Sequence, residues 1–219
     1  MVIPCIDMKI ILIGAGNLAT QLAVALQKKG MTPAYIYSRT RESAEQLSER
    51  LRDVPYSTDI SQVPTDSALL DLVSRMPSNR GLWVHTAGSM DMEVFAPYTA
   101  RYGVFYPMQT FSKERETDFD DIPIFVETNH TDDTERLQKL AGRLSTKVYE
   151  ATSEQRKYLH LAAVFACNFS NHLYALCDRI LSEHGLPFET MLPLIRETAA
   201  KVADMPPAQA QTGPAIRYD

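Results

Sequence analysis

Short apolar runs alternate with helix-like stretches along the first two thirds of the chain. One such stretch carries Leu18, Leu22 and Leu26 four residues apart and is followed by Gly30. Two further helices are predicted over residues 41–52 and 131–145. The apolar runs predict strands over residues 9–13, 34–37, 82–85, 103–105, 122–126 and 147–149. This alternation is typical of an α/β fold with a mostly parallel sheet covered by helices.

The pattern changes at residue 153, beyond which no strand-like run occurs. Helices are predicted over residues 153–184 and 188–204, followed by a proline-rich tail. We therefore predict a sheet domain over residues 1–152 and a smaller all-helical domain over residues 153–219. The second domain is expected to form a homodimer, because it carries more apolar side chains than a terminal helix buries alone. These side chains are Phe165, Phe169, Leu173, Leu176 and Ile180.

One stretch does not fit this alternation. Between Pro64 and Trp83 only a helix-like segment over residues 69–76 is present, where a doubly wound fold also needs a strand. The chain also ends after a proline-rich segment with no closing helix. We therefore expect residues to be missing near Leu70 and after Asp219.

Composition narrows the class of protein. The chain has 219 residues, of which 45% are hydrophobic and 22% charged, with a net charge of -5. The absence of a basic patch disfavours nucleic-acid binding, and polar residues such as Asp178 and Arg179 make the apolar stretch 159–181 unsuited to a membrane. Three scattered cysteines give no disulfide framework, so a cytoplasmic location is expected. Neither H-E-x-x-H nor C-x-x-C occurs, and no metal site is expected.

The glycine-rich segment Gly14-Ala15-Gly16-Asn17-Leu18-Ala19 follows a predicted strand and opens a predicted helix. In this context G-x-G-x-x-A is typical of a Rossmann dinucleotide site. The first glycine permits a tight turn, and the second admits the pyrophosphate close to the backbone. Free N–H groups at the helix start then bind phosphate. A chance glycine-rich turn is the alternative interpretation.

The end of the second predicted strand indicates which dinucleotide binds. NAD sites usually place an acidic residue there, whereas this chain has Ser38-Arg39-Thr40. The Arg39 guanidinium suits a 2′-phosphate, and the two hydroxyls can donate to it. We therefore predict NADP as cofactor; a solvated turn with a helix cap at Ser38 or Thr40 is the alternative, and the two are compatible.

Together these motifs resemble those of a known superfamily. Residues 14–19 and 38–40 are similar to the pyrroline-5-carboxylate reductase and 6-phosphogluconate dehydrogenase superfamily. More closely, the chain resembles a family of Rossmann-like NADP oxidoreductases with a C-terminal helical domain of unknown function. The supporting segments are residues 85–89, 106–111, 158–163 with Asn168, and 212–214; the chain departs from the family at residues 66–72. The resemblance implies a cytoplasmic homodimer with its active cleft between the two domains.

Three polar residues follow the predicted strand 82–85. His85, Thr86 and Ser89 are predicted to contact the cofactor, because ligands gather at the carboxyl ends of strands in such sheets. Alternatively, Ser89 caps a helix over residues 90–96. The loop at residues 106–111 offers Gln109 and Thr110 to a substrate, or is an ordinary connection.

The long C-terminal helix carries His160 and Asn168, which an uninterrupted α-helix places on one broad face. The resemblance implies a polar pair on this helix, so His160 is predicted as proton donor and Asn168 as a substrate ligand. The alternative is that His160 is a core residue whose ring nitrogens are hydrogen-bonded within the protein. Two functions remain open: an NADP(H)-dependent reductase of a small polar carbonyl or imine, and a non-catalytic NADP-binding sensor or regulatory dimer.

Overall fold

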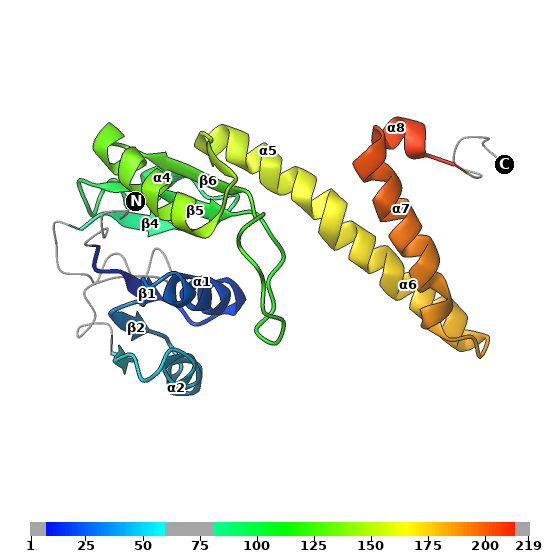
Figure 1. The fold of residues 1–219 in the computed structure, drawn as a ribbon, viewed down its shortest axis with the longest axis horizontal. Coiled ribbons are helices and arrows are strands. Elements are labelled where there is room, and N and C mark those ends of the chain that lie inside the picture. The colour runs from blue at the N-terminus through cyan, green and yellow to red at the C-terminus, as the bar shows by residue number, and fades with distance from the viewer. Residues whose placement is uncertain (1–7, 60–80, 213–219) are drawn as a thin grey trace. The chain divides into compact units, whose positions relative to one another are not determined.

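The structure is a computed structural model that describes residues 8–59 and 81–212 (Figure 1). The chain divides into two compact units, Met1–Ala162 and Ala163–Asp219, which are considered separately. The helix expected over residues 69–76, and the segment near Leu70 where residues were expected to be missing, lie outside the described residues.

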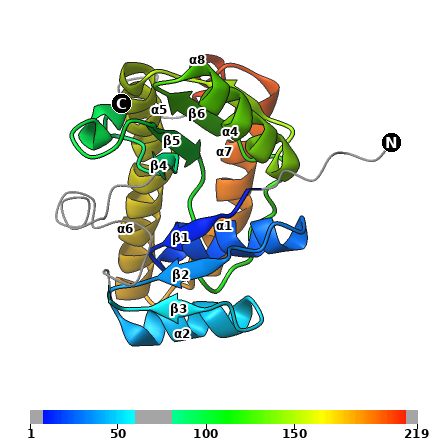
Figure 2. The ribbon, with the colours of Figure 1, turned by 90° about the vertical axis from the view of Figure 1, so that its left-hand side faces the viewer.

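The first unit is an α/β fold with mostly parallel strands, as the sequence predicts. One sheet has the order β1-β2-β3 and is parallel throughout (Figure 2). The other has the order β4-β5-β6-β7, in which only β5 and β6 are antiparallel. The strands are β1 (Ile11–Ile13), β2 (Tyr35–Tyr37), β3 (Tyr56–Ser57), β4 (Trp83–His85), β5 (Tyr102–Pro107), β6 (Ile124–Thr128) and β7 (Val148–Glu150).

Helix α1 (Asn17–Lys28) takes part in the two largest apolar clusters of this unit. Its residues Ala23 and Val24 pack with β1, β2 and α2 (Arg41–Arg50). On its other face, Leu22 and Leu26 pack with β5, β6 and α4 (Thr131–Leu144). The predicted leucine stripe is therefore buried, although Leu18 is only half-buried. The two faces together tie the two sheets to one helix.

Two strands differ from the prediction for local reasons. Strand β3 has only two residues, Tyr56 and Ser57, which is too short to give a hydrophobic pattern. Strand β6 was predicted over 122–126 but begins at Ile124. Pro123 has no N–H to donate to a ladder, so pairing starts after it. Its carbonyl instead accepts a hydrogen bond from the Met108 N–H at 2.8 Å.

The predicted uninterrupted helix over 153–184 is wrong. The structure has α5 (Ser153–Ala163), a π-helical segment (Val164–Phe169) and α6 (Ser170–Glu183). Within the π-helical segment the Ser170 hydroxyl donates to the Phe165 carbonyl, five residues earlier, at 3.4 Å. One widened turn leaves the apolar periodicity almost unchanged, so the sequence pattern does not reveal it.

The remaining helices belong to the second unit. A 3-10 turn (Phe188–Met191) leads into α7 (Leu192–Asp204), and the short α8 (Pro207–Ala210) follows. The unit begins at Ala163, ten residues after the predicted domain boundary, because α5 packs with the first unit. Among residues 163–212, no side chain is buried within the unit.

Candidate functional site

The predicted glycine turn connects β1 to α1 and leaves the start of that helix open. Gly14 has φ +98, a conformation that favours glycine, and its N–H donates to the Tyr37 carbonyl at 2.8 Å. Gly16 is the N-cap with an ordinary φ of -78. A Cβ added at Gly16 would meet nothing within 4 Å, and no side chain in the described residues caps α1. The packing of the described residues therefore leaves room for a side chain at position 16.

Three other residues of the turn have side chains committed to the fold. Ala15 is buried, and Leu18 packs against the core shared with α4. The Asn17 amide donates to the Phe111 carbonyl at 3.0 Å. Only the backbone of these residues, rather than their side chains, is therefore placed to bind an anion at the helix start.

The segment Ser38-Arg39-Thr40 lies beside this turn, because the Gly14–Tyr37 hydrogen bond joins the ends of β1 and β2. Ser38 is buried and its N–H donates to the Ser57 carbonyl at 3.3 Å. Arg39 and Thr40 are exposed. Thr40 is the N-cap of α2, but its side chain makes no capping hydrogen bond among the described residues. The fold thus brings an open helix start and an exposed guanidinium to one edge of the sheet.

His85, at the end of β4, is buried and uses both ring nitrogens to hold the following turn. Nδ1 accepts from the Ala87 N–H at 3.2 Å, and Nε2 lies 3.3 Å from the Asp91 carbonyl. A carbonyl only accepts, so the ring is the neutral Nε2–H tautomer. Burial, and then the positive charge of Arg156, lower the pKa of His85 to about 4. His85 is therefore an organiser of the turn, with no nitrogen left to point at a ligand.

Thr86 and Ser89 follow His85 and differ in exposure. Thr86 is half-buried and Ser89 is exposed. The alternative that Ser89 caps the next helix is wrong, because a 3-10 helix begins at Met92 and Asp91 caps it. The Asp91 carboxylate accepts from the Glu93 N–H at 3.2 Å. The Ser89 hydroxyl is thus not needed as a cap.

A buried ion pair that the sequence analysis missed fixes this loop. Arg156 on α5 is fully buried and lies 2.6 Å from a carboxylate oxygen of Glu127 on β6. Its other nitrogens donate to the carbonyls of Met90 and, at 3.3 Å, Ala87. Glu127 also accepts from the Ser153 N–H and hydroxyl, both at 2.8 Å. No sequence signal identifies Glu127 and Arg156 as partners, because they are 29 residues apart.

His160 lies one turn after Arg156 and contacts two other segments. Its Nδ1 is 3.5 Å from the hydroxyl of Tyr106, at the end of β5. Gly88, in the loop after β4, packs so closely that a Cβ there would lie 2.7 Å from Nδ1. Asn168 is exposed within the π-helical segment of the second unit. The helical geometry that grouped it with His160 assumed an uninterrupted α-helix, which the structure does not have.

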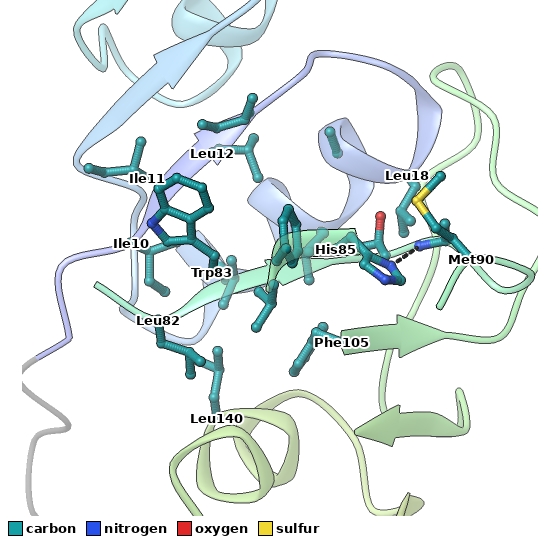
Figure 3. Close-up of a pocket in the computed structure, with 18 residues that line it drawn as sticks. Ile10, Ile11, Leu12, Leu18, Leu82, Trp83, His85, Met90, Phe105 and Leu140 are labelled. Carbon is teal, nitrogen blue, oxygen red and sulfur yellow. Dashed lines mark hydrogen bonds between the residues drawn. The ribbon is translucent and has the colours of Figure 1, made fainter. Parts of the chain in front are cut away.

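An apolar pocket of about 370 Å³ separates β1 from β4 (Figure 3). Its walls include Leu12, Trp83 and Phe105, and its polar end is formed by His85 and Thr86. In a doubly wound sheet the first and fourth strands are neighbours, whereas in the described residues β1 and β4 are not hydrogen-bonded. The lining does not include Gly14 or Gly16, so this space is distinct from the open start of α1.

In residues 8–59 and 81–212, no group of three or more His, Cys, Asp or Glu side chains is placed to hold a metal ion. Over the same ranges, no helix has the length and apolarity needed to cross a membrane.

Two family models match parts of the chain. Residues 3–74 match the model for shikimate / quinate 5-dehydrogenase, which covers the glycine turn and the Arg39 segment. Residues 122–219 match a domain of unknown function, DUF2520. No curated protein matches the chain.

The fold and the open glycine turn define a Rossmann-type α/β protein, and solved structures show its family. The "putative NADP oxidoreductase" of Bacteroides fragilis is 52% identical, with a TM-score of 0.89, over 97% of this chain and 87% of that one. The chain therefore belongs to this Rossmann-like NADP oxidoreductase family.

Two more distant structures share the fold alone. A Thermotoga maritima protein is 23% identical, with a TM-score of 0.78, over 95% of this chain and 85% of that one. A pyrroline-5-carboxylate reductase from Coxiella burnetii is 16% identical, with a TM-score of 0.62, over 96% of this chain and 83% of that one.

The low pKa of His85 predicts a loss of stability in mild acid. The unfolded chain binds a proton near pH 6.5 and the folded chain only near pH 4, so the unfolded state is favoured as the pH falls between these values. Between pH 7 and pH 5 this one group should reduce the free energy of unfolding by about 2 kcal/mol.

Urea unfolding of wild type and His85→Gln, at pH 7, 6 and 5 and one protein concentration, measures this contribution. The variant should be less stable at pH 7 but should lose less on acidification. If the free energy of unfolding changed equally with pH in the two proteins, a buried neutral His85 would be contradicted.

Proposed function

We propose that this protein is an NADP(H)-dependent oxidoreductase that reduces a small polar carbonyl or imine. The observation that carries the proposal is the open start of α1 beside the exposed Arg39. Unpaired N–H groups and the helix dipole favour a pyrophosphate there, and Gly16 leaves room for its approach. Membership of a family that includes a protein named for NADP oxidoreduction supports the same cofactor.

The residues proposed to bind the cofactor form three groups, one for each part of the cofactor that they would contact. Gly14, Gly16 and the backbone of residues 15, 17 and 18 would hold the pyrophosphate, since the side chains of Ala15, Asn17 and Leu18 are engaged elsewhere. Ser38, Arg39 and Thr40 would hold the 2′-phosphate. The nicotinamide end would meet Thr86 and Ser89, with His85 acting through the turn that it organises.

The carboxyl edge of β4 and β5 is proposed as the substrate site. His160 lies at this edge in contact with Tyr106 and Gly88, and we propose that the proton for the substrate comes from it. Asn168, on the second unit, is proposed as a substrate ligand. A sensor would need the same cofactor turn but no proton donor, so the presence of His160 at this edge favours the enzyme.

The second unit is proposed to form a homodimer, and the protein is proposed to be cytoplasmic. By function, we propose that residues 1–152 bind the cofactor and that the helices over residues 153–219 form the dimer interface and contact the substrate. Two helices with no buried side chain have no core of their own, so their apolar faces need another surface. Exposed apolar residues in this unit include Phe165, Phe169, Leu173, Ile180, Leu194 and Val202.

Gly16→Val tests the cofactor turn. The added side chain meets open space, so the fold should be kept, while the room needed by the pyrophosphate is lost. Forcing a side chain into a filled space costs about 1–3 kcal/mol, so we expect NADPH to bind about 10- to 100-fold more weakly. Gly142→Ala, at another glycine with open space, is the matched control and should bind normally. Fluorescence titration and thermal unfolding measure both effects; NADPH binding unchanged in Gly16→Val would refute the site.

Arg39→Ala tests the choice of cofactor. A charge-assisted hydrogen bond contributes about 1.5–3 kcal/mol, so NADPH should bind about 10- to 100-fold more weakly. NADH lacks the 2′-phosphate and should change far less. The loss for NADPH should shrink at high salt, because an exposed pair is screened. Arg41→Ala is the matched control and should show a smaller effect; equal losses for both cofactors would contradict a phosphate role for Arg39.

Substitution in the apolar face tests the homodimer. Phe165→Glu with Phe169→Glu places charges where we propose a dry interface, so the protein should become a monomer. Phe165 and Phe169 are both at least half exposed within the unit, at 59% and 50%, so the change should not disrupt a core of that unit. Sedimentation at micromolar concentration gives the mass of each protein. A wild-type monomer at that concentration would contradict the proposal.

A further inference from the structure

We propose that Tyr106 is the residue that protonates the substrate, and that His160 is its proton relay. This inference rests on the proposed reductase function. It assigns the proton transfer to a pair of residues that belong to one unit, so their contact is defined by the fold of residues 8–59 and 81–162.

The pair lies at the edge of the sheet where ligands bind in doubly wound folds. Tyr106 is near the carboxyl end of β5, which runs parallel to β4 with Val104 opposite His85. Its side chain is buried, with 9% exposed, and its hydroxyl is 3.5 Å from Nδ1 of His160. His160 is half-buried. Tyr106 is thus the more buried member of the pair.

Gly88 packs against both members of this pair. A Cβ at this position would lie 2.7 Å from Nδ1 of His160 and 2.9 Å from Cζ of Tyr106. Both distances are shorter than side-chain contacts allow, so a side chain at position 88 would require the two rings to move. The loop after β4, which also carries Thr86 and Ser89, therefore brings the proposed nicotinamide side against the pair.

Arg156 holds the loop after β4 against α5. It precedes His160 by one turn of α5 and donates to the carbonyls of Ala87 and Met90, on either side of Gly88. Because Arg156 is fully buried and paired with Glu127, it holds the loop in one position. His160 and Gly88 are thus fixed by the same helix.

The proposed step balances in atoms and electrons. A reduced nicotinamide, when bound, would supply hydride, that is a proton with two electrons, to the substrate carbon. The π bond of the carbonyl or imine breaks, and its oxygen or nitrogen takes the proton of the Tyr106 hydroxyl. The proton on Nδ1 of His160 then moves to the phenolate while Nε2 takes up a proton from solvent, so the imidazole stays neutral and the solvent supplies the net proton. A phenol keeps its proton at neutral pH, which suits it to the role of acid.

Tyr106→Phe tests the assignment, because it removes only the hydroxyl. Tyr102→Phe is the matched control: Tyr102 is also buried on β5, but its hydroxyl donates to Glu93 at 2.8 Å. NADPH oxidation is followed with 2-methyl-1-pyrroline and phenylglyoxal as imine and carbonyl probes. Tyr106→Phe should lower kcat/KM about 100-fold or more and leave the Kd for NADPH within about twofold, whereas Tyr102→Phe should leave both unchanged. Turnover by Tyr106→Phe equal to that of wild type would overturn the donor role.

A second measurement tests the pair without turnover. In long-range nitrogen NMR spectra of the full chain, the ring signals of His160 are assigned by their loss in His160→Gln. Tyr106→Phe should shift the Nδ1 signal, whereas Tyr102→Phe should not; an unmoved signal in Tyr106→Phe would overturn the pair. Wild type that binds NADPH but reduces neither probe contradicts the reductase function and with it the donor role. Wild type that does not bind NADPH contradicts the proposed cofactor, and the NMR result still decides whether the two side chains are paired.

Discussion

The buried ion pair between Arg156 and Glu127 is the interaction on which the candidate site depends. It joins α5 to β6, and through the carbonyls of Ala87 and Met90 it joins both to the loop after β4. A buried charge that loses its partner costs about 3–5 kcal/mol, so these segments are held together unless the pair is broken. The pair also explains why the first unit extends to Ala162: α5 packs with the sheet through Arg156, although the sequence places it with the other helices.

Helix α1 holds the glycine turn in place, as the ion pair holds the loop after β4. One of its faces packs with β1 and β2 and the other with β5, β6 and α4, so its first turn has little freedom to move. Asn17 and the buried Gln21 add hydrogen bonds to the carbonyls of Phe111 and Ser112, at 3.0 and 2.6 Å, in the loop after β5. An open helix start binds an anion well only if its N–H groups are already in place. The packing of α1 meets that requirement.

The sequence predicted well those features that depend on neighbours along the chain. The alternation of strands and helices, the turn at Gly14 and the position of Arg39 all follow from local patterns. Features that depend on distant contacts were not predicted: Glu127 and Arg156 show no shared pattern, and His85 was expected to face a ligand although its ring is committed to Ala87 and Asp91. The π-helical turn at Val164–Phe169 was missed because it changes backbone hydrogen bonding while apolar residues continue.

Three glycines show how one residue type meets three different physical demands. Gly14 has a positive φ, so the chain's own conformation requires it. Gly88 has no such conformation, but the rings of His160 and Tyr106 occupy the space that a Cβ would fill. Gly16 has neither constraint among the described residues, since its φ is ordinary and an added Cβ would meet nothing there within 4 Å. The described part of the fold therefore leaves room at position 16 for the close approach that the proposed pyrophosphate site needs, and the first N–H groups of α1 favour an anion.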